Sequence, residues 1–161
     1  MCDVLDSALE TFRERSEREG VAIRREFDSD GELLGDAEKL RRVMINLVGN
    51  ALDALEDANV EDPAIDVSMG ENLAGNEVWV RIRDNGLGID SETQSQIFTP
   101  FYTAKRNGTG LGLAITKKLV DVHQGHIEVS AAAGQGAEFV LRFPKHEVGH
   151  RSRSAFEGDL S

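Results

Sequence analysis

The chain has 161 residues, of which 40% are hydrophobic and 29% are charged, and it carries a formal net charge of −11. This balance fits one globular domain of ordinary size, and it excludes a wholly disordered chain. The acidic charge disfavours nucleic acid and anionic lipid as partners, no apolar run approaches the roughly 18 residues of a membrane span, and Cys2, as the single cysteine, excludes an internal disulfide. We therefore expect a cytoplasmic domain without direct membrane contact.

The first half of the chain predicts a helix, a strand and a longer helix. Apolar residues at helical spacing favour an amphipathic helix over 3–19, and Gly20 ends it. Residues 21–27 alternate as a strand, and Asp36 is a suitable cap for a helix that runs to about Asp57. The apolar stripe of this helix consists of Leu40, Val43, Met44, Leu47, Val48, Ala51 and Leu55.

The second half alternates strands and shorter helices. We expect strands at 65–69, 78–82, 127–130 and 137–143, and helices at 91–97 and from about Leu111 to His123. This order predicts one mixed sheet with helices on one face, an α/β (α+β) two-layer sandwich. The predicted organisation is a helix leading into the domain over 1–20, the domain proper over 21–145, and a disordered polar tail over 146–161.

The first motif that bears on chemistry is RRVMINLVGNALDAL at 41–55. Asn46 and Asn50 lie four residues apart, so they share one face of the second helix. A side-chain amide offers a neutral carbonyl oxygen, which suits Mg²⁺. Capping of neighbouring loops explains two asparagines equally well, and the residues alone leave both interpretations open.

The second motif is DNGLGI at 84–89, directly after a predicted strand. Gly86 and Gly88 allow a tight turn and a close approach of the backbone to a flat ligand. Asp84 stands at the strand end, where its carboxylate can accept a hydrogen bond from an exocyclic amine such as that of adenine. The alternative is an ordinary Asn-Gly turn.

The third motif is IFTPFYTAK at 97–105. Aromatic residues flank Pro100 and suit the docking of a mobile segment, and Lys105 can reach a phosphate. The alternative is a loop packed into the core, and we expect Phe98 to pack there in either case.

The fourth motif is NGTGLGLAI at 107–115, where Gly108, Gly110 and Gly112 precede a helix. Glycine-rich backbone at a helix N-terminus presents N–H donors and the positive end of the helix dipole to phosphate. The spacing is not that of a P-loop, and the dinucleotide-binding fingerprint fails because no strand immediately precedes the glycines.

Together, in this order and spacing, the four segments resemble the catalytic domain of sensor histidine kinases, within the GHKL nucleotide-binding superfamily. NLVGNALDAL resembles the N box, DNGLGI the first glycine box, FTPFYTAK the F box and GTGLGLAI the second glycine box. The resemblance covers roughly residues 5–145 and implies the Bergerat fold, in which three helices back a mixed sheet and a flexible lid covers ATP. The short lid resembles that of nitrogen-regulatory kinases.

The resemblance also implies roles for single residues, with ATP and Mg²⁺ as cofactors. Asn50 would hold Mg²⁺, Asp84 would accept from the adenine amine, Gly86 and Gly88 would make room for the base, and Lys105 would neutralise phosphate charge. The lid residues that would face the phosphates are Gly108, Thr109, Gly110, Leu111 and Gly112. Ala137 stands where many relatives have a hydroxyl residue near adenine.

Asn46 separates two mechanisms within the superfamily. Its ATPases usually have a glutamate at the matching position, and an amide cannot take a proton from water. With Asn46 and Lys105 as catalytic residues, we expect slow hydrolysis and transfer of the γ-phosphoryl group to an external histidine. The alternatives are a GHKL-type ATPase and a non-catalytic ATP-binding regulatory module.

The acceptor histidine is missing from this sequence. The chain has four histidines, His123, His126, His146 and His150, and none stands in an H-E-x-x-x-P context. We therefore expect a monomer that does not autophosphorylate alone and whose partners in a two-component phosphorelay are the histidine-bearing dimerisation domain of the same parent protein and a response regulator receiver domain. HEVGH at 146–150 matches a zinc motif but lies in a polar segment, so we interpret it as accidental, and we expect His123 and His126 to pack or cap near the last helix.

Overall fold

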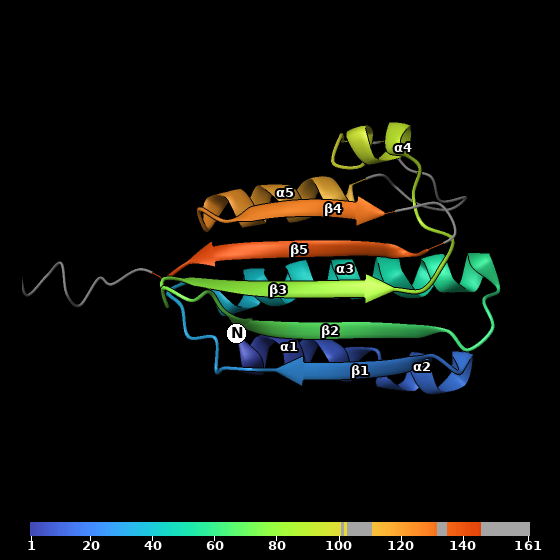
Figure 1. The fold of residues 1–161 in the computed structure, drawn as a ribbon, viewed down its shortest axis with the longest axis horizontal. Coiled ribbons are helices and arrows are strands. Elements are labelled where there is room, and N and C mark those ends of the chain that lie inside the picture. Colours follow the sequence, from blue (N-terminus) through green and yellow to red (C-terminus); the bar gives the residue numbers. More distant parts are fainter. Residues whose placement is uncertain (101, 103–110, 132–134, 146–161) are drawn as a thin grey trace, which may run out of the picture.

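The computed structural model describes residues 1–100, 102, 111–131 and 135–145. They form a two-layer sandwich of a mixed five-stranded sheet with helices on one face, which confirms the predicted fold class (Figure 1). The strands are β1 (Ala22–Phe27), β2 (Ala64–Glu71), β3 (Glu77–Asp84), β4 (His126–Ala131) and β5 (Ala137–Pro144). The helices are α1 (Cys2–Thr11), α2 (Arg13–Glu19), α3 (Ala37–Ala58), α4 (Ser91–Gln96) and α5 (Gly112–Val122).

The strand order in the sheet is β1-β2-β3-β5-β4. Strands β1 and β2 pair in parallel, while the pairs β2–β3, β3–β5 and β4–β5 are antiparallel. A parallel pair needs a crossover connection, and α3 supplies it. Figure 1 shows α1, α3 and α5 behind the sheet, as the family resemblance implies.

Helix α3 is the centre of the helical layer and begins where the sequence predicts. The carboxylate of Asp36 accepts hydrogen bonds from the backbone N–H groups of Glu38 and Lys39 at 3.0 and 3.1 Å, as an N-cap does. All the predicted stripe residues are buried, and Leu52 joins them. The C-terminal end of the neighbouring helix α5 contacts this cap, because Nε2 of His123 accepts a hydrogen bond from the Asp36 N–H at 3.0 Å. His123 is the C-cap residue of α5 and packs edge-on against Phe143, as expected, whereas His126 is exposed at the start of β4.

The prediction of one helix over 3–19 is wrong in one respect. The chain breaks at Phe12, whose φ of −103° and ψ of 5° separate α1 from α2. The Phe12 ring packs against α3 at Gly49, where a Cβ would lie 3.4 Å from the ring. Leu5 and Ala8 of α1 are fully buried in the same core as α3. The boundary at residue 20 stays a prediction, although these helices pack as part of the same body.

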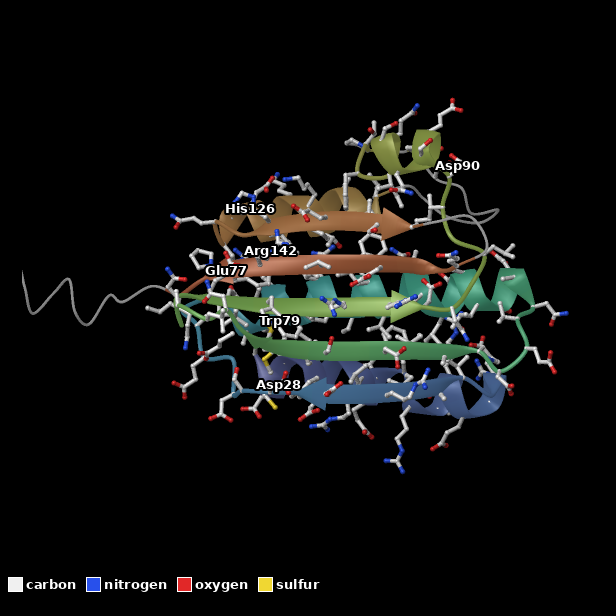
Figure 2. All side chains as sticks on the ribbon, viewed as in Figure 1. Asp28, Glu77, Trp79, Asp90, His126 and Arg142 are labelled. Atoms are coloured by element: carbon white, nitrogen blue, oxygen red, sulfur yellow. The ribbon has the colours of Figure 1, made fainter. Side chains whose placement is uncertain are left out.

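The other face of the sheet carries polar side chains. Trp79, Arg142 and His126 are register neighbours on β3, β5 and β4 and lie on this face (Figure 2). The Trp79 ring lies over Gly70 of β2, where a Cβ would come within 2.7 Å of the indole. Among the helices within the described residues, none is long and apolar enough to cross a membrane.

Candidate functional site

A cavity of about 480 Å³ opens at the end of the sheet where β3 ends and β5 begins. Its wall combines the C-terminal half of α3, the loop after β3, the short helix α4 and the first turn of α5. This size falls within the usual range for small-molecule sites. Four of the predicted ATP-binding residues border this cavity, namely Asn50, Asp84, Gly88 and Gly112, and Ala137 borders it as well.

Asp84 is the one buried carboxylate among the described lining residues, with 5% of its surface exposed. Its Oδ1 accepts hydrogen bonds from the backbone N–H groups of Gly86 at 2.9 Å and Ala137 at 3.3 Å. The carboxylate is therefore held by main-chain groups on both sides, from the following loop and from β5. Neither of these bonds uses Oδ2, which can accept a donor from a molecule in the cavity.

The electrostatics of Asp84 favour such a donor. Burial raises the pKa of the carboxyl group above its ordinary value, while the N–H groups of Gly86 and Ala137 and the charge of Arg83 act in the opposite direction. Burial thus disfavours the charged form of this carboxyl group. A ligand N–H that pairs with Oδ2 would offset part of this cost.

The two glycines of the DNGLGI segment have different roles, since Gly86 leaves room for the Asp84 carboxylate and Gly88 permits a left-handed turn. A Cβ on Gly86 would lie 3.0 Å from Asp84 Oδ1, a spacing tighter than ordinary contact, so a larger residue would press on the carboxylate. Gly88 has a φ of +81°, in the left-handed region that favours glycine, and it borders the cavity. Asn85 closes the loop against the start of β2, because its side chain accepts from the Ala64 N–H at 2.8 Å.

The two asparagines of α3 have different surroundings. Asn50 borders the cavity, but Asn46 is not among the lining residues. Instead, Nδ2 of Asn46 donates to the carbonyl oxygen of Gly112 at 3.3 Å and to Oγ1 of Thr116 at 3.2 Å. Asn46 therefore joins α3 to the first turns of α5, and its catalytic role stays a prediction.

The first turn of α5 borders the cavity through Gly112 and Leu113. The residue before it, Leu111, has no side-chain acceptor for the orphan N–H groups of this turn, and no acidic residue follows within it. A Cβ on Gly112 would meet no described atom within 4 Å. The N–H groups and the positive dipole end of a helix N-terminus that borders a cavity suit an anion.

Helix α4 forms the outer wall of the cavity. Nε2 of Gln94 donates to the carbonyl oxygens of Ile89 at 2.8 Å and Ala131 at 2.9 Å, which ties α4 to both the glycine loop and the end of β4. Phe98 packs edge-on against Phe139 with ring centroids 6.4 Å apart, so its predicted place in the core is confirmed.

Several predicted site residues lie outside the described residues. They are Lys105, Gly108, Thr109 and Gly110, together with the HEVGH segment at 146–150. Within the described part of the chain, no group of three or more His, Cys, Asp or Glu side chains is placed to hold a metal ion. The amide oxygen of Asn50, a described residue that borders the cavity, is of the ligand type that Mg²⁺ accepts.

Sequence reasoning missed three residues that support the site. Gly136 has a φ of +82°, and a Cβ there would overlap the carbonyl oxygen of Asp84. Thr116 is fully buried beside Asn46, and Gln94 braces α4. A glycine directly before a strand signals a special backbone position, but nothing local to Thr116 or Gln94 marks either of them.

Comparison with known proteins identifies a family and relatives with similar sequences. The family described as "Histidine kinase-, DNA gyrase B-, and HSP90-like ATPase" matches residues 35–147, which include every described element of the cavity. The C4-dicarboxylate transport sensor protein DctB of Rhizobium meliloti (strain 1021) is 39% identical over 146 residues. That alignment covers 90% of this chain but 23% of DctB, so this chain spans about a quarter of that relative.

The chain is also similar in fold to solved structures of histidine kinases. The nucleotide-free catalytic domain of histidine kinase ThkA matches with a TM-score of 0.78 and 29% identity, over 90% of this chain and 92% of that one. ThkA in complex with response regulator protein TrrA matches with a TM-score of 0.74 and 26% identity, over 91% of this chain and 40% of that one. Full-length ShkA in complex with AMPPNP matches with a TM-score of 0.75 and 27% identity, over 89% of this chain and 30% of that one.

Proposed function

The chain belongs to the family of histidine kinase-, DNA gyrase B- and HSP90-like ATPases, and from this premise we propose that it is the ATP-binding catalytic domain of a sensor histidine kinase. It would transfer the γ-phosphoryl group of ATP to a histidine on a separate dimerisation domain of its parent protein. The observation that carries this proposal is one cavity that is bordered by a buried carboxylate, Asp84, by an amide, Asn50, and by the first turn of α5.

The Asp84 region suits adenine. Oδ2 of Asp84 would accept a hydrogen bond from the exocyclic amine of adenine, at the position where guanine carries a carbonyl oxygen. Small and apolar lining residues, among them Ala54, Ala137 and Ile97, provide surfaces for a flat aromatic base. The absence of a hydroxyl at position 137 leaves the Asp84 contact as the main determinant of base recognition.

The α5 end of the cavity suits phosphate only with a cation. Besides Asp84, the carboxylates of Asp57 and Asp90 border the cavity, and a polyphosphate would be repelled by them. The first turn of α5 supplies N–H donors, and the carbonyl oxygen of Asn50 would hold Mg²⁺. The ion would neutralise charge on the phosphate oxygens. By resemblance, Lys105 and the glycine segment that contains Gly108, Thr109 and Gly110 would contribute on the same side.

Asn46 favours phosphoryl transfer over hydrolysis. An amide cannot act as the general base for water. Its nitrogen already donates to two acceptors on α5, which orients the side chain toward that helix. Because no base at position 46 activates water, the γ-phosphoryl group would be transferred to a histidine acceptor. A response regulator would receive the phosphoryl group next, since the similar kinase ThkA forms a complex with the response regulator protein TrrA. We place this reaction in the cytoplasm.

The test is a phosphotransfer assay with the chain, Mg²⁺, ATP and the histidine-bearing dimerisation domain of its parent protein. This domain is expected to be a helical hairpin and is called the hairpin below. We expect acid-labile phosphohistidine on the hairpin, and none when the chain is incubated alone. Asn50→Ala should lower its formation at least tenfold, because even indirect partners of a metal are worth about 10- to 100-fold. Asn76→Ala, in the turn between β2 and β3 at the other end of the sheet, is the matched control and should leave the rate unchanged.

Two results would contradict the proposal. Steady release of inorganic phosphate that ignores the hairpin would identify an ATPase. Tight binding of ATP with neither hydrolysis nor transfer, under conditions in which the hairpin accepts phosphate from a related kinase, would identify a regulatory binding module.

A further inference from the structure

Thr116 is a buried polar residue in α5 that the proposed chemistry does not use. None of its surface is exposed. Its hydroxyl group donates to the carbonyl oxygen of Gly112 at 2.8 Å and accepts from Nδ2 of Asn46 at 3.2 Å. The same Nδ2 donates to the Gly112 carbonyl oxygen at 3.3 Å, so the three groups form a closed triangle.

This triangle lies next to the phosphate-facing end of the cavity. Gly112 is the first residue of α5 and borders the cavity. Asn46 lies one helical turn before Asn50, which borders the cavity from α3. The triangle therefore fixes the distance and angle between the two elements that the proposed function assigns to phosphate and to magnesium.

We propose that Thr116 is a positioning residue for the triphosphate: it holds the N-terminus of α5 in register with Asn50 and leaves the adenine end of the cavity unaffected. This inference rests on the proposed function. The adenine end depends on Asp84, which is held by Gly86 and Ala137 and not by α5. The two ends of the ligand should thus respond separately to a change at Thr116.

The triangle also selects an amide at position 46. Both bonds of Asn46 run from its nitrogen to oxygen atoms on α5. A carboxylate at this position would set an oxygen against the Gly112 carbonyl, with no proton between them. Asn46→Asp should therefore loosen the same contact from the side of α3, although it keeps the size of the side chain.

The test compares affinities for adenosine and for ADP with Mg²⁺, by calorimetry on the full chain. Thr116→Val keeps the shape and removes the hydroxyl group. We expect ADP affinity to fall about three- to tenfold, the value of one or two hydrogen bonds, and adenosine affinity to change less than twofold. Thr116→Ser should restore ADP affinity, and Asn46→Asp should show the same selective loss, so the test does not depend on one variant.

Thr11→Val is the matched control. The Thr11 hydroxyl also donates to the carbonyl four residues earlier, that of Ser7 at 3.2 Å, and accepts from an α3 side chain, Arg41, at 3.2 Å. It lies away from the cavity and should change neither affinity.

The inference is overturned if Thr116→Val weakens adenosine and ADP equally, or weakens neither while the wild type binds both. If the wild type binds neither ligand, the proposed function fails and this inference fails with it.

Discussion

At the scale of single residues, the site depends on how Asp84 is held. Its Oδ1 is fixed by two main-chain N–H groups, and burial raises its pKa. A carboxylate held in this way is pre-oriented for a ligand but costs the protein stability while it is charged. Stability and binding should therefore respond in opposite directions to a change at this residue.

We predict this opposite response for Asp84→Asn, whose amide oxygen can still accept from both N–H groups. Because the folded state holds the Asp84 proton more tightly than the unfolded chain, wild-type stability falls as pH rises through the raised pKa. The variant should thus be at least as stable as the wild type at neutral pH. This difference should vanish near the unperturbed value of about 3.9. Urea unfolding at a series of pH values measures it. A variant clearly less stable at neutral pH would contradict this account.

Nucleotide affinity should also depend on the protonation of Asp84, but in the opposite direction to stability, because affinity should fall as pH falls. As pH falls through the raised pKa, the proton on Asp84 removes the acceptor for the adenine amine, and affinity should drop. This drop should begin above the ordinary titration range of aspartate, and it should be absent in Asp84→Asn, whose affinity is already low.

A second residue prediction concerns Gly136. Its positive φ and the overlap of a Cβ with the Asp84 carbonyl mean that Gly136→Ala must move the backbone that donates to Asp84. We expect a loss of about 2 kcal/mol or more in the free energy of unfolding, together with weaker nucleotide binding. Gly75→Ala is the control, since Gly75 has a φ of +70° but no described atom within 4 Å of the Cβ position. It should cost about 1 kcal/mol and leave binding intact.

The sequence predicted the residues that belong to local motifs better than those that act across the fold. Asn50, Asp84 and Gly112 stand in recognisable segments, and the structure gathers them at one cavity. Thr116 and Gly136 matter because of partners 70 and 52 positions earlier, respectively Asn46 and Asp84. Such contacts depend on helix and strand packing, which no local pattern specifies.

At the scale of elements, periodicity and capping identified nearly every helix and strand. The stripe of α3 and its Asp36 cap are both confirmed, because each has a local cause in spacing and in side-chain chemistry. The break at Phe12 was not predictable, since no glycine or proline marks it and the Phe12 ring packs against Gly49 on another helix. Charged residues that continue after Phe12 hide that break in the sequence.

The two aspartate caps should have different effects when they are removed. Asp36 caps the central helix α3, so Asp36→Ala should lower the free energy of unfolding by about 1 kcal/mol and leave nucleotide affinity unchanged. Asp90 caps the short helix α4, which has no buried residue, by accepting from the Thr93 N–H at 2.7 Å. Asp90→Ala should hardly change the stability of the whole domain but should loosen the cavity wall and weaken the binding of adenosine, which carries no phosphate for the Asp90 carboxylate to repel.

Denaturant unfolding and calorimetric titration of both variants check this contrast. The reverse pattern, with Asp36→Ala weakening binding and Asp90→Ala lowering global stability, would contradict the assignment of α3 to the core and of α4 to the wall.

At the scale of the whole molecule, the site exists because of the strand order. Placing β5 beside β3 brings Ala137 to Asp84, and the crossover through α3 brings Asn50 to the same end of the sheet. The sequence predicted a mixed sheet with helices on one face, but its patterns contain no information on which strands are neighbours. The family resemblance implied three helices behind a mixed sheet, and the strand order β1-β2-β3-β5-β4 came from the structure.

Net charge acts at this scale as well. A domain with a formal charge of −11 repels polyphosphates, so the cation and the helix N-terminus must reverse that field locally. This requirement links the acidic composition to the proposed dependence on magnesium.

The central claim is that this one cavity binds an adenine nucleotide, with the base at Asp84 and the phosphates between Asn50 and the start of α5. Titration with ADP and Mg²⁺, followed by backbone and side-chain amide NMR, tests it most directly. We predict saturable shifts at Gly86, Ala137, Leu113 and the Asn50 side chain, and none at the turn between β2 and β3. Shifts centred on any other face of the molecule, or no shifts at millimolar ADP, would contradict it.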